Sequence, residues 1–249
     1  MSSPLEPVIV DGHFSDEEEL ASGEDLTSTT AVQLHRIVER NDDFKRFMMS
    51  YKFGLDEMMT KVNILKEEFS YTHDYNPIEH VHSRLKTPES ILVKAQRKNI
   101  NPTSENLRAA MSDIAGIRIT CSFISDTYII RDLLIGQDDI TVIEVKDYIA
   151  TPKPNGYQSL HVIVEVPVYM SDRVESVRVE LQIRTVAMDF WASVEHKLYY
   201  KYDGRVPASL LDELTDAAAA VNRLDRKMER LHDEVSKLGG GFPSGPQRQ

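Results

Sequence analysis

The sequence has little cysteine and tryptophan, and it has no long apolar run. One of its 249 residues is cysteine, Cys121, so an internal disulfide framework is excluded. No apolar stretch approaches the ~18 residues that a membrane-spanning helix requires. The first residues are acidic and lack the basic and then apolar pattern of a secretory signal peptide. These absences favour a cytoplasmic protein that does not enter a membrane.

Positive charge is missing from one end of the chain. Residues 1–30 contain eight acidic residues and no lysine or arginine. The whole chain has a net charge of -11, so the remaining residues have a net charge of about -3. Because this segment is also rich in Ser and Thr, we expect a disordered, solvating tail. Residues 239–249, which are rich in Gly, Pro and Gln, are expected to form a second, flexible tail. Residues 31–238 would then form a single domain.

Basic residues are concentrated in residues 84–98, which carry five of them against the single acid Glu89. Thr87 followed by Pro88 is typical of a helix N-terminus, so we expect a helix over residues 88–98. On that helix three residues recur at spacings of four and three and share one face, namely Ser90, Lys94 and Arg97. Such a face is either simply solvated or an anion site. A local charge of +4 in an acidic protein favours a polyphosphate ligand.

The hydrophobic period changes near residue 113 from helical to alternating. We expect helices over 31–70, 88–98, 104–111, 125–136, 186–201 and 207–237, and strands over 114–123, 140–149, 161–168 and 174–184. This order predicts an α+β fold, or an α/β core, in which a mixed sheet is flanked by helices. The helix over 207–237 carries a long apolar stripe that must pack on the body or on another subunit.

The clearest strand signal is residues 177–184, where apolar and polar side chains alternate without interruption. A strand with this pattern turns its apolar residues to the core and gathers the others on the opposite face, namely Arg178, Glu180, Gln182 and Arg184. One interpretation is a half-solvated sheet whose charges compensate one another. The other is a functional site that contains Glu180.

Asp113 stands at the start of a second strand-like run, in which Arg118 and Thr120 alternate with isoleucines. Gly116 within this run suggests a β-bulge or the close approach of another group. Asp113 and Glu180 could converge on one ion, because Mg²⁺ prefers a few carboxylates together with phosphate oxygens and water. Two isolated acids are, however, more often plain surface charges.

A rigid loop connects the second and third expected strands. Residues 152–161 read Pro-Lys-Pro-Asn-Gly-Tyr-Gln-Ser-Leu-His, and the prolines and the glycine restrict the backbone. Tyr157 in this loop offers an aromatic platform on which a base could stack. A turn tyrosine that packs on its own sheet is an equally good interpretation.

Four motifs occur in order along the chain: Arg84-x-Lys86-x-x-x-Ser90-x-x-x-Lys94, Asp113-Ile-Ala-Gly-Ile-Arg118, Lys153-Pro-Asn-Gly-Tyr157-Gln-Ser-Leu-His161 and Glu180-Leu-Gln-Ile-Arg-Thr185. Together they resemble the synthetase domain of the RelA/SpoT family, and the resemblance runs from about residue 30 to 235. The chain is similar to small alarmone synthetases, the stand-alone form of that domain. The resemblance implies a nucleotidyltransferase-like synthetase fold with about five strands.

The activity that this resemblance implies is that of a GTP or GDP 3′-pyrophosphokinase. Such an enzyme moves the β,γ-pyrophosphate of ATP to the ribose 3′-OH of a guanine nucleotide, with Mg²⁺ as cofactor, and produces (p)ppGpp and AMP. This reaction needs alignment and charge neutralisation more than covalent chemistry by the protein. The family's habit also implies a homotetramer that associates through its terminal helices.

The resemblance assigns site residues by motif position. Adenine would lie between Arg84 and Arg118, and the ATP phosphates would be held by Lys86, Ser90, Lys94 and Arg97. The catalytic and metal-binding pair would be Asp113 and Glu180, with Glu180 also acting on the acceptor 3′-OH. The acceptor would be bound by Tyr157, which stacks on guanine, and by Lys153, Asn155, Gln158, His161 and Gln182.

The sequence departs from the family in three respects. No His and Asp pattern of the family's hydrolase domain precedes the motifs, and its regulatory C-terminal domains are missing, so hydrolysis and ribosome-coupled control are not expected. Residues 144–147 mix the two forms of a motif that biases the family toward GDP or GTP, which leaves the acceptor open among GMP, GDP and GTP. His80 and His82 replace the Phe and Thr with which tetrameric relatives bind pppGpp in a central cleft, so allosteric activation is not expected.

Two other classes of function compete with this reading. The first is a catalytically silent regulator that binds nucleotides or RNA on the same fold, although no feature of the sequence supports RNA as a partner. The retention of both Asp113 and Glu180 argues against it, because a pure binder has no need of two acids among phosphates. The second is a nucleotidyltransferase that releases pyrophosphate.

Overall fold

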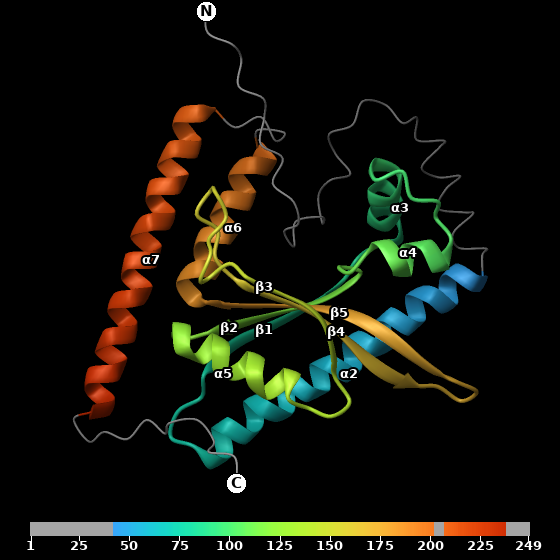
Figure 1. Cartoon of the computed structure of the whole chain (residues 1–249), viewed down its shortest axis with the longest axis horizontal. Helices are drawn as coiled ribbons and strands as arrows, with labels where there is room; N and C mark the ends of the chain where they lie inside the picture. The colour runs from blue at the N-terminus through green and yellow to red at the C-terminus, as the bar shows by residue number, and fades with distance from the viewer. Residues whose placement is uncertain (1–41, 202–206, 238–249) are drawn as a thin grey trace, which may run out of the picture.

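The computed structural model describes residues 42–201 and 207–237 (Figure 1). Its elements in chain order are α2 (Asp42–Thr72), β1 (Ile78–Leu85), α3 (Pro88–Arg97), α4 (Ser104–Ala110), β2 (Ala115–Cys121), α5 (Ile124–Ile135), β3 (Thr141–Asp147), β4 (Leu160–Tyr169), β5 (Val174–Thr185), α6 (Val186–Lys201) and α7 (Ala208–Lys237). The predicted α+β architecture, a mixed sheet flanked by helices, is confirmed.

The five strands form one sheet in the order β1-β2-β5-β4-β3. The central pair, β2 and β5, is parallel, and all other neighbours are antiparallel. Strand β1 was expected only as an extended segment, not as a strand. It lies at an edge of the sheet, where one of its eight residues is buried, and it lacks the apolar alternation by which the central strands were found.

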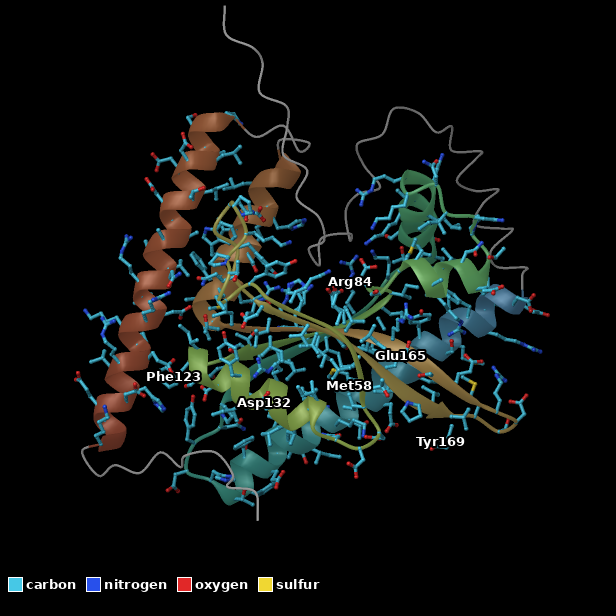
Figure 2. The ribbon with its side chains drawn as sticks, viewed as in Figure 1. Met58, Arg84, Phe123, Asp132, Glu165 and Tyr169 are labelled. Atoms are coloured by element: carbon cyan, nitrogen blue, oxygen red, sulfur yellow. The ribbon has the colours of Figure 1, made fainter. Side chains whose placement is uncertain are left out.

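One face of the sheet is covered by α2 and α5 (Figure 1). The apolar residues of β5 turn to this face and are fully buried, as their alternation predicts; they are Val177, Val179, Leu181 and Ile183. Met58, at the middle of α2, is also fully buried in this core (Figure 2). Helix α2 crosses β5 closely at Gly54, where an added Cβ would come within 2.5 Å of Val177. The core therefore fixes the sheet from one side only.

The other helices lie at the two ends of the molecule, with α3 and α4 at one end and α6 and α7 at the other (Figure 1). Helix α3 begins as predicted: the Thr87 side chain accepts a hydrogen bond from the Ser90 N–H, and Pro88 is the first helical residue. Helix α6 is capped by the Thr185 hydroxyl, which also donates to Asp225 of α7. This last contact ties α7 to the end of β5.

Most predicted boundaries agree with the structure to within two residues. The first predicted helix, 31–70, is found only from Asp42 to Thr72, because residues 31–41 lie outside the described part of the chain. Both predicted tails, 1–30 and 239–249, lie outside it as well. The bulge suggested at Gly116 is wrong, since the register of β2 runs through this residue without a shift. The described helices include none with the length and apolarity needed to cross a bilayer.

Candidate active site

The face of the sheet that α2 and α5 leave open carries polar residues across all five strands. Direct register partners place His82, Arg118, Gln182, His161 and Lys146 in one row from β1 to β3. Residues in register across neighbouring strands point to the same side of a sheet. The polar sides of strands far apart in sequence therefore form one continuous surface.

Glu180 lies near the centre of this surface. His161 Nδ1 lies 3.2 Å from its Oε1, and Gln182 Nε2 donates to its Oε2 at 3.2 Å. The Glu180 side chain is 13% exposed, whereas Gln182 and Arg184 are buried. The part of the strand that follows Glu180 is therefore buried rather than half-solvated, contrary to one interpretation of its sequence. The two hydrogen bonds hold the Glu180 carboxylate in one orientation.

Asp113 is bound by two lysines that come from different elements. Lys86 Nζ lies 3.0 Å from Asp113 Oδ2, and Lys94 of α3 donates to the same oxygen. Burial by itself would raise the pKa of Asp113, but the two lysines outweigh it and lower that pKa to about 2. Asp113 is therefore an ionised carboxylate at every pH near neutrality. Lys86, expected to approach from an extended segment, is itself buried.

The donor set around Asp113 fits a hard divalent cation. Both lysines bind Oδ2, and Oδ1 accepts no hydrogen bond from the described residues. Within the described ranges no group of three or more His, Cys, Asp or Glu residues could hold a metal. An open carboxylate oxygen without a protein cage suits Mg²⁺, which keeps water and takes its remaining ligands from a bound phosphate.

Two arginines lie beside one another at the β1–β2 edge of the polar surface. Arg84 pairs in register with Gly116, and Arg118 lies two residues further along β2. Diagonal neighbours of this kind are ~7–8 Å apart, about twice the ~3.5–4 Å contact distance of carbon atoms. The glycine opposite Arg84 adds no side chain between them. Arg84 Nη2 is buried and makes no hydrogen bond among the described residues, and Figure 2 places Arg84 near the middle of the molecule.

The expected anion-binding face of α3 is only partly brought to this surface. Lys94 reaches Asp113, as described above. Ser90 accepts a hydrogen bond from the Thr87 hydroxyl at 3.1 Å. Arg97 is exposed at the last turn of the helix. The structure therefore places Lys86 and Lys94 together with Asp113, while Arg97 lies at the rim.

The loop between β3 and β4 is packed down rather than open. Tyr157, expected to stack on a base, is fully buried against Trp191 and Ala218. Its hydroxyl lies 2.8 Å from His161 Nε2 and accepts from Arg184 at 3.1 Å. Gly156 has φ of 87°, and an added Cβ would lie 2.3 Å from the Ala218 Cβ. In this arrangement Tyr157 has no ring face open to guanine, and stacking would require the loop to leave α7.

His161 connects the loop to Glu180. Both of its ring nitrogens are engaged, one by Tyr157 and the other by Glu180. Burial lowers the pKa of His161 although Glu180 opposes this, so the ring is neutral at neutral pH. His161 therefore acts here as a hydrogen-bonded bridge to Glu180 rather than as a cationic phosphate ligand.

The remaining predicted acceptor residues fix the loop. Lys153 Nζ lies 5.1 Å from the centre of the Tyr157 ring, and Asn155 Oδ1 accepts the Tyr157 N–H at 3.2 Å. Gln158 is buried and donates to the Ile149 carbonyl at 3.0 Å. This hydrogen bond joins the two ends of the β3–β4 loop, and the expected contact of Gln158 with the acceptor stays a prediction.

The sequence interpretation missed Glu195 of α6. This residue is 3% exposed and accepts a hydrogen bond from Asn155 Nδ2 at 3.1 Å. Burial raises its pKa to about 7, against the opposing effects of Asn155 and Lys153. A signal was available, since Glu195 stands one helical turn after Trp191 on a face that must be apolar. An acid at such a position is rarely fully buried unless it has a partner.

Comparisons with known proteins show the family to which this chain belongs. Residues 83–205 match the model described as the region found in RelA / SpoT proteins. The chain is 48% identical over 211 residues to the GTP pyrophosphokinase YwaC of Bacillus subtilis, which covers 85% of this chain and 99% of that protein. It is 40% identical over 199 residues to the GTP pyrophosphokinase YjbM of the same organism, covering 80% and 93%.

Solved structures agree with this match. The small alarmone synthetase 2 from Bacillus subtilis superposes with a TM-score of 0.71 at 48% identity, over 78% of this chain and 100% of that one. The small alarmone synthetase 1 from Bacillus subtilis, bound to its product pppGpp, gives a TM-score of 0.73 at 39% identity, over 79% and 100%. The chain belongs to the RelA/SpoT family of GTP pyrophosphokinases, and it has the fold of the small alarmone synthetases.

Proposed function

We propose that this chain is a GTP or GDP 3′-pyrophosphokinase that makes (p)ppGpp and AMP. The observation that carries the proposal is the joining of all four motifs on one polar face of the sheet, with Asp113 held by two lysines and Glu180 by His161 and Gln182. The relatives named as GTP pyrophosphokinases, and the synthetase bound to pppGpp, support the same activity. The acceptor is a guanine nucleotide, and its number of 5′-phosphates stays open among GMP, GDP and GTP.

The donor subsite is proposed at the β1–β2 edge. Arg84 and Arg118 would enclose adenine between their guanidinium planes, since their diagonal placement leaves room for one base. The phosphates would be held by Lys86, Ser90, Lys94 and Arg97. A synthetase 1 structure with bound AMPCPP, 36% identical to this chain at a TM-score of 0.66, supports an adenine nucleotide as donor.

The chemistry is proposed to centre on Asp113 and Glu180. The oxygen of the ribose 3′-OH attacks the β-phosphorus of ATP, the bond from that phosphorus to the oxygen shared with the α-phosphate breaks, and AMP leaves. Glu180, which His161 and Gln182 hold in place, would take the hydroxyl proton. When bound, Mg²⁺ would neutralise charge on the transferred group, with Asp113 Oδ1 and Glu180 as its protein ligands.

The acceptor subsite is proposed at the β3–β4 loop. We assign Lys153 and Asn155 to contacts with the guanine nucleotide and Gln182 to the orientation of Glu180. Stacking of Tyr157 on guanine would accompany release of the loop from Trp191 and Ala218. The Tyr157 hydroxyl would then exchange its bonds to His161 and Arg184 for solvent or ligand.

Incubation with labelled ATP and GDP, with and without Mg²⁺, tests this function. AMP together with a guanosine phosphorylated at both 5′ and 3′ positions is the expected result. Release of pyrophosphate would identify a nucleotidyltransferase instead. Retained nucleotide binding without turnover in either condition would identify a silent regulator.

A further inference from the structure

The C-terminal end of α4 is held by an arginine of β5. Arg178 Nη1 donates to the carbonyl oxygen of Arg108 at 3.1 Å and lies 3.5 Å from that of Ala109. These carbonyls belong to the last turn of a short helix, where no N–H of the helix itself can satisfy them. A cation at this end also interacts favourably with the helix dipole. Arg178 thus supplies partners that α4 lacks.

Arg178 is itself held in one orientation. Its Nε donates to Glu165 Oε1 at 2.9 Å, and Glu165 is its direct register partner on β4. The second carboxylate oxygen of Glu165 accepts from the Ser176 hydroxyl at 3.2 Å. Figure 2 shows Glu165 on the same side of the molecule as α4. The side chains of Arg178 and Glu165 are 29% and 25% exposed, so solvent reaches the pair only in part.

The two proposed metal-binding carboxylates lie on either side of this junction. Glu180 follows Arg178 by two residues in β5 and shares its face of the sheet. Asp113 follows the last residue of α4 by three residues, and Met111 between them is buried at 1% exposure. The segment that carries Asp113 therefore has little slack once the end of α4 is fixed. Gly116 of β2, three residues after Asp113, is the register partner of Glu180, so the β2–β5 ladder fixes one end of the segment that carries Asp113 and the junction of α4 with Arg178 fixes the other.

A second arginine anchors α4 to the core independently. Arg108 Nη2 donates to Glu175 Oε2 at 3.0 Å and to the Ser50 hydroxyl at 2.9 Å. Its guanidinium also lies over the rings of Phe47 and Tyr51. Because these contacts hold α4 on α2, the helix keeps its place in the fold when Arg178 is changed. The contribution of Arg178 is then the finer placement of the α4 end against β5.

From this arrangement, and resting on the proposed function, we propose that Arg178, oriented by Glu165, is a positioning residue that sets the separation of Asp113 and Glu180. It touches neither substrate nor metal and acts through the α4 carbonyls and the strand that carries Glu180. Groups that orient metal ligands in this indirect way change metal affinity or activity by roughly 10–100-fold when removed. No motif of the sequence singles out Arg178, which in strand 177–184 looked like a charge-balancing surface residue.

The experiment compares Arg178→Met, Arg178→Lys and Glu165→Gln with the control Arg131→Met. Arg131 is an arginine of α5 that pairs with Asp132 and lies over the Tyr128 ring, away from the contacts that hold α4. Binding of Mn²⁺ in the presence of α,β-methylene ATP is followed by electron paramagnetic resonance. Steady-state kinetics and the thermal midpoint are measured on the same preparations. Asp113→Asn gives the level of Mn²⁺ binding without the protein ligand.

We expect Arg178→Met to weaken Mn²⁺ binding and lower kcat by roughly 10–100-fold, with KM for GDP unchanged. Arg178→Lys should give an intermediate loss, because its single nitrogen lacks the two separate donor atoms, Nε and Nη1, with which Arg178 reaches Glu165 and the carbonyl. Arg131→Met should match the unchanged protein. Wild-type Mn²⁺ binding and kcat in both Arg178→Lys and Glu165→Gln would overturn the inference, and these two variants decide it if Arg178→Met does not fold. Failure of the unchanged protein to synthesise (p)ppGpp would instead overturn the proposed function.

Discussion

At the scale of single residues, the site depends on carboxylates in contrasting surroundings. Asp113 receives two lysines and has its pKa lowered to about 2, whereas Glu195 lies in an apolar cluster and has its pKa raised to about 7. The difference follows from their partners: ammonium groups stabilise the charged form, and burial penalises it. Glu180 is held by His161 and Gln182 rather than by a lysine.

Glu180→Gln tests the proposed proton acceptor. The amide keeps the size of the side chain but cannot accept the hydroxyl proton, so we expect kcat to fall by roughly 10²–10⁴-fold. The measurement is AMP formation from ATP and GDP at saturating Mg²⁺. Asp172→Asn, at an exposed position in the β4–β5 turn, is the matched control and should be fully active. Substantial activity in a folded Glu180→Gln variant would contradict the proposed mechanism.

Glu195 predicts a pH-dependent stability. Its pKa rises from an ordinary value of 4.5 to about 7 on folding, so between these values the folded state holds a proton that the unfolded state has lost. Stability then falls as pH rises from about 4.5 to 7. Urea unfolding midpoints are measured at pH 5, 6, 7 and 8. The midpoint of Glu195→Gln should increase relative to that of the unchanged protein as pH rises. A pH-independent difference between the two would contradict the buried, protonated acid.

At the scale of elements, the β3–β4 loop joins the acceptor subsite to α6 and α7. Its described contacts with these helices include Gly156 on Ala218, Tyr157 on Trp191, and Asn155 to Glu195. Such a loop can exchange a packed state for a ligand-bound one at modest cost, because few apolar groups separate. The packed state is the one that buries Tyr157.

Two substitutions at Tyr157 separate its ring from its hydroxyl. Tyr157→Ala removes the ring, and the loss of base stacking, ~1–3 kcal/mol, should raise KM for GDP by roughly 5- to 150-fold. Tyr157→Phe keeps the ring, and because the hydroxyl would leave His161 and Arg184 when guanine binds, we expect kcat nearly unchanged and KM for GDP no higher than in the unchanged protein. Initial rates at varied GDP and fixed ATP give both constants. Equal KM values in the two variants would show that guanine does not stack on this ring.

At the scale of the whole molecule, α7 carries an apolar stripe that the described residues leave partly exposed. Leu224, Met228, Leu231 and Val235 are each between 42% and 51% exposed, and their spacing of four, three and four is that of a helix–helix seam. Residues on the other side of α7, such as Asp225 and Ala218, are buried against the body. We propose that this stripe contributes to the predicted homotetramer.

Leu231→Glu tests this assembly. A charge in the seam should shift the tetramer to smaller species without unfolding the subunit, because Leu231 lies outside the core. Light scattering after size exclusion measures the mass, and circular dichroism measures the fold. Arg230→Glu, an exposed neighbour on another face of α7, should leave the mass unchanged. A monomeric unchanged protein, or a tetrameric Leu231→Glu, would contradict the assignment.

Much of the fold could be predicted from local patterns. The alternation in residues 177–184 identified β5 and its core face, and Thr87-Pro88 located the start of α3, because both signals are set by residues close in sequence. The edge strand β1 was not predicted, since the apolar residues of its sequence IEHVHSRL do not alternate with polar ones at a period of two. The sequence could not show whether Gly116 forms a bulge, because a glycine in a strand can mark either a bulge or the close approach of another group.

The sequence by itself determined the residue types of the site, their order and, through the motifs, the family. Only the tertiary structure decided which of them meet: that Lys86 and Lys94 bind Asp113, that His161 bridges Tyr157 to Glu180, and that Glu195 and Arg178 support the loop and α4. The reason is physical. Hydrophobic periodicity and secondary-structure propensity depend on a few neighbouring residues. Burial, pKa values and the separation of two carboxylates depend on strands and helices that the fold brings together from distant positions in the chain.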